Sequence, residues 1–364
     1  MLDMQFYCGK KILITGHTGF KGSWLCKMLV NVGAKVTGYS LPATTEPNLF
    51  AVSGLANQLN TIIGDIRDLH KLKEVFKTVQ PEIVIHLAAQ PLVLDSYKNP
   101  LETYEVNVMG TVNILECIRQ TSCVKSFLNI TTDKVYHNRE WVWGYREDDP
   151  LDGFDPYSNS KSCSELVTNS YKKSFFNDNR VAISTARSGN VIGGGDFSSN
   201  RIIPDCIRAA EKQEVIKVRN PQSIRPYQHV LEPLIAYLTI VQAQYDDIRY
   251  AGYFNVGPDD CDCITTGELA DLFCELWGEG MFWKSTNING QHEANFLKLD
   301  CSKMKQIFGW KPVWRMNIAM EKVVEWTKIY LRGGDVSSCM NSQIKEFLQS
   351  KEAVVVEKGD SYRR

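Results

Sequence analysis

The sequence has no apolar run long enough to cross a membrane. A spanning helix needs about 18 or more consecutive apolar residues, and the most apolar segment, Val230 to Val241, is interrupted by Glu232 and Pro233. The first residues also lack a basic stretch followed by an apolar one, so the sequence predicts no secretory signal. We therefore expect a cytoplasmic protein.

The sequence also lacks an excess of charge of either sign. It contains 41 Lys and Arg against 42 Asp and Glu, which gives a formal net charge of -1. Such a balance provides no basic field for nucleic acid, so an anionic ligand has to be bound by local cations. The 11 cysteines include no Cys-x-x-Cys pair and no set with zinc-ligand spacing. Reduced thiols and no metal site are therefore expected.

What is present is typical of a globular protein. Hydrophobic residues make up 43% and charged residues 23% of the 364 residues, and this length favours about two domains. Short apolar runs alternate with segments of helical period in the first half, which predicts an α/β fold with a doubly wound parallel sheet. Strands are expected at 10–15, 35–40, 60–64, 82–88, 124–131 and 181–185, and helices at 22–32, 69–78, 99–120 and 155–176.

The alternation stops after residue 187, and this change predicts the domain boundary. Residues 1–187 are expected to form the sheet domain, to which a segment near 228–258 returns. Residues 188–335 are expected to form a smaller C-terminal α/β domain from discontinuous segments, with one helix at 202–212 and another at 266–277. The last residues, 336–364, are polar, and we expect a frayed tail.

A glycine-rich turn lies between the first expected strand and the first expected helix. Gly16, Gly19 and Gly22, with Thr18 and Phe20 between them, would allow a tight turn and a close approach of the backbone to a pyrophosphate at a helix N-terminus. This pattern predicts a dinucleotide-binding Rossmann domain. Neither an acid nor an arginine directly follows the strand at 35–40, so the 2′-phosphate of NADP has no obvious partner and NAD is favoured.

A second pattern, Tyr157-x-x-x-Lys161, falls on the expected helix at 155–176. Residues four apart lie on one face of a helix, so the ammonium group can approach the phenol. A free tyrosine has a pKa of about 10, and lowering it toward 7 requires that Lys161 and the positive nicotinamide of the cofactor together outweigh the effect of burial. The spacing therefore favours a tyrosine that transfers protons.

The two motifs together resemble the extended short-chain dehydrogenase/reductase family. The glycine spacing is Gly-x-x-Gly-x-x-Gly, and the Tyr-Lys pair follows at the distance that this family uses. The resemblance implies that Asp65 and Ile66 face the adenine of the cofactor. It also implies that the segment containing Leu87, Ala88 and Ala89 passes under the nicotinamide ribose.

A finer resemblance, to the CDP-glucose 4,6-dehydratases, spans nearly the whole chain. It rests on Thr132-Asp133-Lys134 after the fifth expected strand and on motifs from the glycine turn to Gly309-Trp310. Leu94, Val135 and His137 depart from the pattern at positions near the expected substrate. This resemblance implies a lyase in which tightly bound NAD is regenerated, and it implies a homodimer formed through the helices at 99–120 and 155–176.

The resemblance also implies roles for individual residues. Thr132 would orient the 4-hydroxyl of the sugar, Tyr157 would take its proton with the help of Lys161, Asp133 would be the acid and Lys134 the base of the elimination. The diphosphate of a CDP-sugar requires cationic donors. The residues expected to contact this substrate are Gln90, Asn190, Arg201, Arg219, Arg225 and His292.

Alternative functions remain open at this point. The same motifs fit a nucleotide-sugar 4-epimerase, or a 4,6-dehydratase for a dTDP-, UDP- or GDP-sugar, and base specificity rests on likeness alone. A protein that only binds a dinucleotide and senses its redox state is a further alternative. The presence of Thr132, Tyr157 and Lys161 together argues against it, because a binder has no need of all three.

Overall fold

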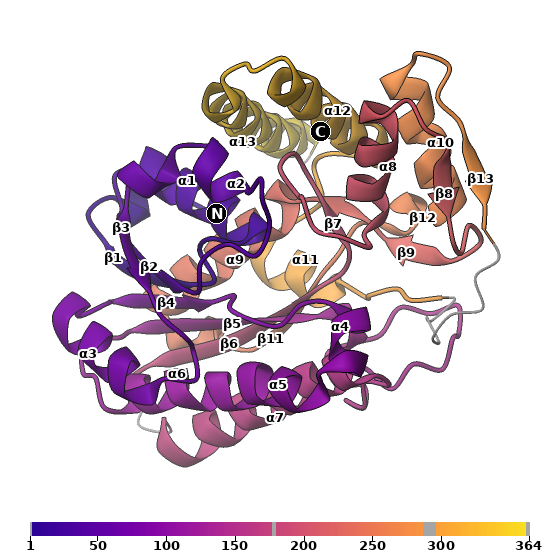
Figure 1. The fold of residues 1–364 in the computed structure, drawn as a ribbon. Helices are drawn as coiled ribbons and strands as arrows, with labels where there is room; N and C mark the ends of the chain where they lie inside the picture. The colour runs from indigo at the N-terminus through magenta and orange to yellow at the C-terminus, as the bar shows by residue number, and fades with distance from the viewer. Residues whose placement is uncertain (1, 177–179, 287–295, 362–364) are drawn as a thin grey trace.

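A computed structural model describes residues 2–176, 180–286 and 296–361, with side chains up to residue 351. A large parallel sheet with helices on both faces forms one part, and a smaller lobe of helices and short strands lies beside it (Figure 1). The sheet confirms the predicted α/β class. The active-site candidates lie where the two parts meet.

The central sheet has seven strands, all parallel, in the order β11-β6-β5-β4-β1-β2-β3. The order reverses between β1 and β4, and ligands bind at such switch points outside the carboxyl ends of the strands. The last strand in sequence returns to the edge beside β6. The bounds are β1 Lys11–Thr15, β2 Lys35–Ser40, β3 Asn60–Ile63, β4 Ile83–His86, β5 Ser126–Thr132, β6 Ala182–Ser188 and β11 Tyr253–Val256.

Helices cover both faces of the sheet. In Figure 1, α3 (Leu69–Val79), α6 (Gly110–Arg119) and α7 (Pro156–Phe175) lie on the lower face. On the other face lie α1 (Phe20–Asn31) and α9 (Leu231–Asp246), and α9 packs against β5 and β6. Every residue of β5 is buried, as expected for a strand that is covered on both sides.

The helix predicted at 99–120 is interrupted by a π-helical turn. It consists of α5 (Pro100–Tyr104), the π turn η3 (Glu105–Met109) and then α6. Such π-bulges re-aim side chains inside a helix. Here the turn contains Asn107, whose amide accepts a hydrogen bond from the backbone N–H of Gln90 at 2.9 Å and donates to Ser160 at 2.9 Å. The loop after β4 is thereby fixed to α7.

The smaller lobe has its own core between α8 (Ile202–Glu211), α10 (Thr266–Trp277) and α12 (Met316–Leu331). A capping box starts α10 at Thr265. Three pairs of short strands complete the lobe. They are β7 Val191–Ile192 with β10 Gln228–His229, β8 Ile216–Val218 with β13 Trp283–Ser285, and β9 Ile224–Pro226 with β12 Cys263–Thr265.

The remaining helical elements are short. Four of them have four to seven residues: η1 before β1, α2 after β2, α4 after β4 and α11 after β13. The others are three-residue turns. The bounds are η1 Met4–Tyr7, α2 Leu49–Val52, η2 Leu55–Asn57, α4 Val93–Lys98, η4 Asp133–Val135, η5 Ile248–Tyr250, η6 Asp260–Asp262 and α11 Ser302–Phe308.

The prediction of a frayed tail at 336–364 is wrong for residues 336–361. Residues Val336–Ser361 form helix α13, which packs against α12 and α1. Met340, Ile344 and Phe347 are buried, and the Phe347 ring packs edge-on against Trp314. These apolar residues recur at helical spacing, so they form one buried face of the helix although the segment as a whole is polar. Within the described residues, no helix, α13 included, is long and apolar enough to cross a membrane.

Candidate active site

A cavity of about 1190 Å³ opens at the carboxyl ends of the strands, between the sheet and the smaller lobe. Its volume exceeds the ~300–1,000 Å³ of common single-ligand pockets, so it has room for a dinucleotide and a second ligand. Most of the residues predicted from the sequence line it. These are Gly16, Thr18, Gly19, Phe20, Gly22, Asp65, Ile66, Leu87, Ala88, Ala89, Thr132, Lys134, Tyr157, Lys161, Asn190, Arg201, Arg219 and Arg225.

The glycine turn forms a cradle that side chains would fill. Gly16 has φ +74°, and a Cβ there would lie 2.8 Å from the backbone nitrogen of Ala88. A Cβ on Gly22 would lie 2.2 Å from the carbonyl oxygen of Gly16. Gly19 precedes α1 without a side-chain cap, so the first N–H groups of the helix are free to bind an anion. The turn therefore fits a pyrophosphate.

The part of the cavity beside β2 and β3 is polar and has little charge. Ser40 and Thr18 contact each other through their hydroxyls at 2.9 Å. The segment 41–45 that continues the wall contains no Lys or Arg. Asp65 is paired with Arg67 (Oδ2 to Nη2, 2.7 Å), and the hydrogen bonds from Arg67 lower the pKa of Asp65. No cation for a 2′-phosphate follows β2.

Helix α7 brings Tyr157 and Lys161 to the end of β5. Asp155 caps this helix by accepting from Ser158 N–H at 2.9 Å, and Pro156 occupies its first turn, where a missing N–H costs nothing. The Lys161 ammonium donates to the carbonyl of Ile130 in β5 at 2.9 Å. The two site residues are therefore fixed against the strand that ends in Thr132.

For the protein by itself, the environment of Tyr157 raises its pKa, so Lys161 alone does not make the phenol acidic. Burial raises the pKa of Tyr157 to about 12, and a hydrogen bond with Thr132 opposes this only in part. Burial also lowers the pKa of Lys161 to about 8, against the field of Glu165. Desolvation disfavours both charged forms, so an additional positive charge is needed to make the phenol acidic.

Asp133 and Lys134 form an ion pair next to Thr132. The Lys134 Nζ donates to Asp133 Oδ1 at 2.9 Å and to the Asn190 side-chain oxygen at 3.1 Å. Thr132 Oγ1 donates to the same Oδ1 at 2.9 Å. Asp133 is fully buried behind the cavity wall, and its Oδ2 has no hydrogen-bond partner. Of the pair, only Lys134 lines the cavity.

Three arginines lie at the end of the cavity that faces the smaller lobe. Arg225 is buried in β9 and its Nη1 donates to the carbonyl of Ile224 at 3.1 Å. Arg201 pairs with Asp196 at 3.1 Å, and Arg219 donates to a backbone carbonyl at 3.2 Å. All three line the cavity, which gives this end a positive charge.

Of the described residues predicted to contact the substrate, Gln90 does not line the cavity. Gln90 uses its side-chain amide to close the loop after β4, since Nε2 donates to Leu92 O and Thr103 Oγ1 and Oε1 accepts from Leu92 N–H. His292 lies outside the described residues. Among the described residues, substrate contacts are therefore expected from the strand ends and the arginines.

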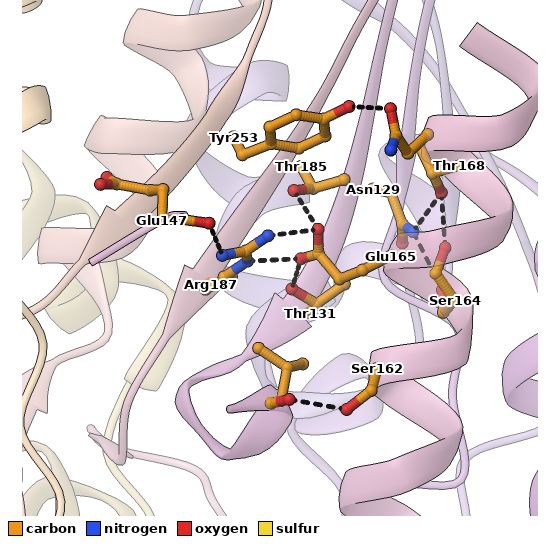
Figure 2. A network of polar contacts seen from close by, with 12 residues as sticks. Asn129, Thr131, Glu147, Ser162, Ser164, Glu165, Thr168, Thr185, Arg187 and Tyr253 are labelled. Atoms are coloured by element: carbon orange, nitrogen blue, oxygen red, sulfur yellow. Dashed lines mark hydrogen bonds and ion pairs between the residues drawn. The ribbon is translucent and has the colours of Figure 1, made fainter. Parts of the chain in front are cut away.

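A buried ion pair behind β5 was not predicted from the sequence. Glu165 Oε2 and Arg187 Nη2 are 3.0 Å apart and the two side chains are 1% and 2% exposed. Figure 2 shows that Thr131 and Thr185 also donate to the Glu165 carboxylate. The network joins α7, one turn beyond Lys161, to β5 and β6. Because Glu165 and Arg187 are 22 residues apart in the sequence, no local pattern indicates that they form a pair.

A second unpredicted feature is Lys21, within the glycine turn. Its Nζ donates to Ser188 Oγ at the end of β6, at 2.9 Å, and it lines the cavity. The signal in the sequence was a lysine between Gly19 and Gly22, at the start of a helix.

The parallel sheet, its glycine cradle and the Tyr-Lys pair beside Thr132 define a protein of the extended short-chain dehydrogenase/reductase class. Within that class, residues 13–323 match the family model described as GDP-mannose 4,6 dehydratase. The chain belongs to this dehydratase family.

Similar proteins support the same placement. The chain is 46% identical to a CDP-glucose 4,6-dehydratase of Salmonella typhimurium, over 96% of this chain and 99% of that one. Among solved structures, UDP-glucose 4-epimerase of Thermotoga maritima matches with a TM-score of 0.78 at 21% identity, over 88% of this chain and 99% of that one. dTDP-glucose 4,6-dehydratase of Bacillus anthracis matches with a TM-score of 0.74 at 20% identity, over 90% and 99%. These two likenesses concern the fold.

Proposed function

We propose that the protein is an NAD-dependent lyase that dehydrates CDP-D-glucose to CDP-4-keto-6-deoxy-D-glucose. The overall change is oxidation at C4, loss of water across C5 and C6, and reduction at C6. The observation that carries the proposal is the Asp133-Lys134 pair, 2.9 Å apart, directly beside Thr132 and Tyr157. The 46% identity to a CDP-glucose 4,6-dehydratase supports the choice of nucleotide.

The cavity fits NAD as the cofactor. Gly16, Gly19 and Gly22 would hold the pyrophosphate, because any Cβ at the first or the last of them would clash with the backbone. Asp65 and Ile66 would border the adenine, and the absence of a cation at 41–45 favours NAD over NADP. When bound, NAD would take a hydride from C4 of the sugar and return it at C6, which side chains cannot do.

Tyr157 and Thr132 would handle the proton of the 4-hydroxyl. Their side chains are hydrogen-bonded to each other, so a sugar hydroxyl at this point would meet both oxygens. Lys161 stays fixed to Ile130 O at 2.9 Å and supplies a positive charge on the same helix face. Tyr157, as the phenolate, would accept the proton of the 4-hydroxyl as C4 becomes a keto group, and the phenol would lose this proton again before the next turnover.

Asp133 and Lys134 would carry out the elimination. A base needs a neutral amine, and an acid needs a protonated carboxyl. One proton shift along the hydrogen bond from Lys134 Nζ to Asp133 Oδ1 produces both forms at once. Lys134 faces the cavity and would remove the C5 proton. Asp133 would supply the proton for the departing C6 hydroxyl, and this role requires substrate binding to open a path to the buried carboxyl.

The smaller lobe would hold the nucleotide of the sugar. Arg201, Arg219 and Arg225 face the cavity from residues beyond 188, and guanidinium groups suit a diphosphate. We therefore assign residues 1–187, with the return segment near 228–258, to NAD binding and 188–335 to CDP-sugar binding. Helix α13, in 336–364, would stabilise the two parts by packing against α1 and α12.

The outer face of α5, η3 and α7 would form a homodimer. Leu101, Met109 and Leu166 on these elements are 73%, 52% and 53% exposed, and apolar side chains gathered on helices favour contact with a second copy. Light scattering would give the mass of two chains, and Leu166→Glu would shift the protein toward one.

We place the protein in the cytoplasm. All eleven cysteines are free thiols, as expected in a reducing compartment.

The test of the proposed function is product formation in deuterated water. The protein with NAD and CDP-glucose should form a 4-keto-6-deoxy sugar that absorbs in alkali and carries deuterium at C5. Lys134→Ala should abolish this incorporation, and Lys303→Ala, on α11 outside the cavity lining, serves as the control. Turnover of dTDP-, UDP- or GDP-glucose in preference to CDP-glucose, or release of a 4-epimer, would contradict the proposal. Parental deuterium exchange by Lys134→Ala would refute the base assignment.

A further inference from the structure

We propose that Asn190 is a positioning residue for the elimination, because its side-chain amide holds the Lys134 nitrogen in place while a proton moves between Lys134 and Asp133. This inference rests on the proposed function, which assigns Lys134 as the base and Asp133 as the acid. It gives a second role to a side chain that the sequence predicted only as a contact of the substrate.

The backbone places Asn190 beside the acid–base pair, two residues beyond the end of β6. Its carbonyl oxygen accepts from the Gln228 N–H at 3.0 Å, which connects it to β10. The preceding Gly189 allows a close approach, because a Cβ there would lie 2.6 Å from Pro226 Cγ and 3.2 Å from Asp133 Oδ2. The main chain therefore fixes the point from which the amide reaches Lys134.

The chemistry of lysine determines which way the amide faces. The Lys134 ammonium carries donors only, so its contact with Asn190 at 3.1 Å has to be made to the amide oxygen, Oδ1. The Nδ2 group then lies on the other branch of the amide, and it can donate to a ligand because Asn190 lines the cavity. One amide can therefore contact the base and the substrate at the same time.

The two hydrogen bonds of Lys134 respond differently to proton transfer. Nζ donates to Asp133 Oδ1 at 2.9 Å, and this is the bond along which the proton would pass. After the shift, the carboxyl is the donor and the amine nitrogen the acceptor. The Asn190 amide oxygen accepts an N–H from the ammonium and from the neutral amine alike. It is therefore the contact that can hold Nζ in the same place in both states.

The elimination requires this fixed place. The neutral amine takes the proton from C5, the electron pair of that bond forms the C5–C6 double bond, and the C6 hydroxyl leaves as water with the proton of Asp133. Lys134 is then an ammonium and Asp133 a carboxylate again. The Lys134 side chain is long and 28% exposed, so loss of the contact would let Nζ move. A misplacement of about 1 Å can slow a reaction ~10²-fold.

The experiment follows two steps of a single turnover with the NAD-loaded protein and saturating CDP-glucose. Absorbance of bound NADH reports oxidation at C4, and deuterium uptake from deuterated water reports proton removal at C5. Asn190→Ala removes the amide but keeps the backbone bond to Gln228. It should form bound NADH at the parental rate and take up deuterium about 10²-fold more slowly. Bound NADH should therefore accumulate, which a damaged fold would not cause.

The conservative variant is Asn190→Asp. It keeps an acceptor oxygen for Lys134 but loses the Nδ2 donor, so it should restore most of the C5 rate while the KM for CDP-glucose rises. The matched control is Asn31→Ala at the end of α1. The Asn31 amide donates to Asn341 at 2.9 Å and lies outside the cavity lining, so its loss should change neither step.

Three results would overturn the proposal. The first is parental deuterium uptake by Asn190→Ala at saturating CDP-glucose. The second is equal slowing of both steps, because the residue would then act on substrate binding or on folding. The third is a C5 rate for Asn190→Asp below that of Asn190→Ala, because the amide would then serve only the diphosphate of the substrate. If the wild type forms neither bound NADH nor a 4-keto-6-deoxy product from CDP-glucose, the proposed function itself fails.

Discussion

Replacing Arg187 with methionine tests how the catalytic helix is held against the sheet. The guanidinium pairs with Glu165 at 3.0 Å, and its Nη1 donates to the Glu147 carbonyl at 2.8 Å (Figure 2). The same Nη1 also donates to the Tyr136 hydroxyl at 2.8 Å. Methionine keeps much of the volume but removes the charge and all of these hydrogen bonds. The Glu165 carboxylate then stays buried with only the hydroxyls of Thr131 and Thr185.

The expected loss of stability follows from the burial of the ion pair rather than from the distance between its atoms. Removing one partner of a buried ion pair costs ~3–5 kcal/mol because the remaining charge is desolvated and unpaired. Since two hydroxyls still stabilise Glu165, we expect Arg187→Met to lower the free energy of unfolding by about 3–4 kcal/mol. Arg249 and Asp247 are closer, at 2.6 Å, but the arginine side chain is 87% exposed. Arg249→Met should therefore cost much less than Arg187→Met.

The assay is equilibrium unfolding in urea, followed by tryptophan fluorescence, for both single variants and for the double variant Glu165→Gln with Arg187→Met. Neutralising Glu165 removes the unpaired charge, so the double variant should be more stable than Arg187→Met alone by about 1–2 kcal/mol. If Arg187→Met costs no more than Arg249→Met, or if the double variant is the least stable of all, the reasoning is refuted.

Three further predictions follow from the site and from one buried acid. Tyr157→Phe should keep NAD binding but lower kcat by about 10²- to 10⁴-fold, the usual range for a lost acid–base group; undiminished turnover would exclude Tyr157 from the chemistry. Gly22→Ala should weaken NAD binding in calorimetry, because its Cβ would lie 2.2 Å from Gly16 O; parental affinity would contradict the cradle. Burial raises the pKa of Glu232 to about 8. The folded protein therefore keeps a proton on Glu232 that the unfolded chain releases above about pH 4.3. Because the unfolded chain binds fewer protons over this interval, the free energy of unfolding falls as the pH rises from about 4.3 toward 8. Glu232→Gln should therefore gain stability relative to the wild type, on the order of 2–4 kcal/mol, over that interval, and a difference that is constant with pH in thermal unfolding would refute it.

The parts of the fold that the sequence predicted are those with a local pattern. The run at 35–40 became β2 without a change of bounds, because β-branched and aromatic residues (Val36, Thr37 and Tyr39) between turn signals favour a strand. The helix α9 gave no clear period, since it is buried on almost all sides. The tail was mistaken for a frayed end because its average is polar, although Met340 and Phe347 lie on one buried face.

In the candidate site, too, the features with a local sequence pattern were predicted, and the contacts between distant residues were not. Glycine spacing and the Tyr157-Lys161 pair are short motifs, so both the cradle and the helix face were predicted from residues close in sequence. Lys134 and Asn190 meet at 3.1 Å although 56 residues separate them. Gln90 was expected to contact the substrate, but its amide closes its own loop.

The sequence alone determined the alternation of strands and helices, the glycine turn after β1 and the shared helix face of Tyr157 and Lys161, because each depends on contacts within a few residues. Only the tertiary structure decided the environment of those groups. It places Lys161 on the Ile130 carbonyl, Lys21 on Ser188 and Arg187 on Glu165. Burial and charge act through space, and they depend on which strands are neighbours and in what register, which no local pattern specifies.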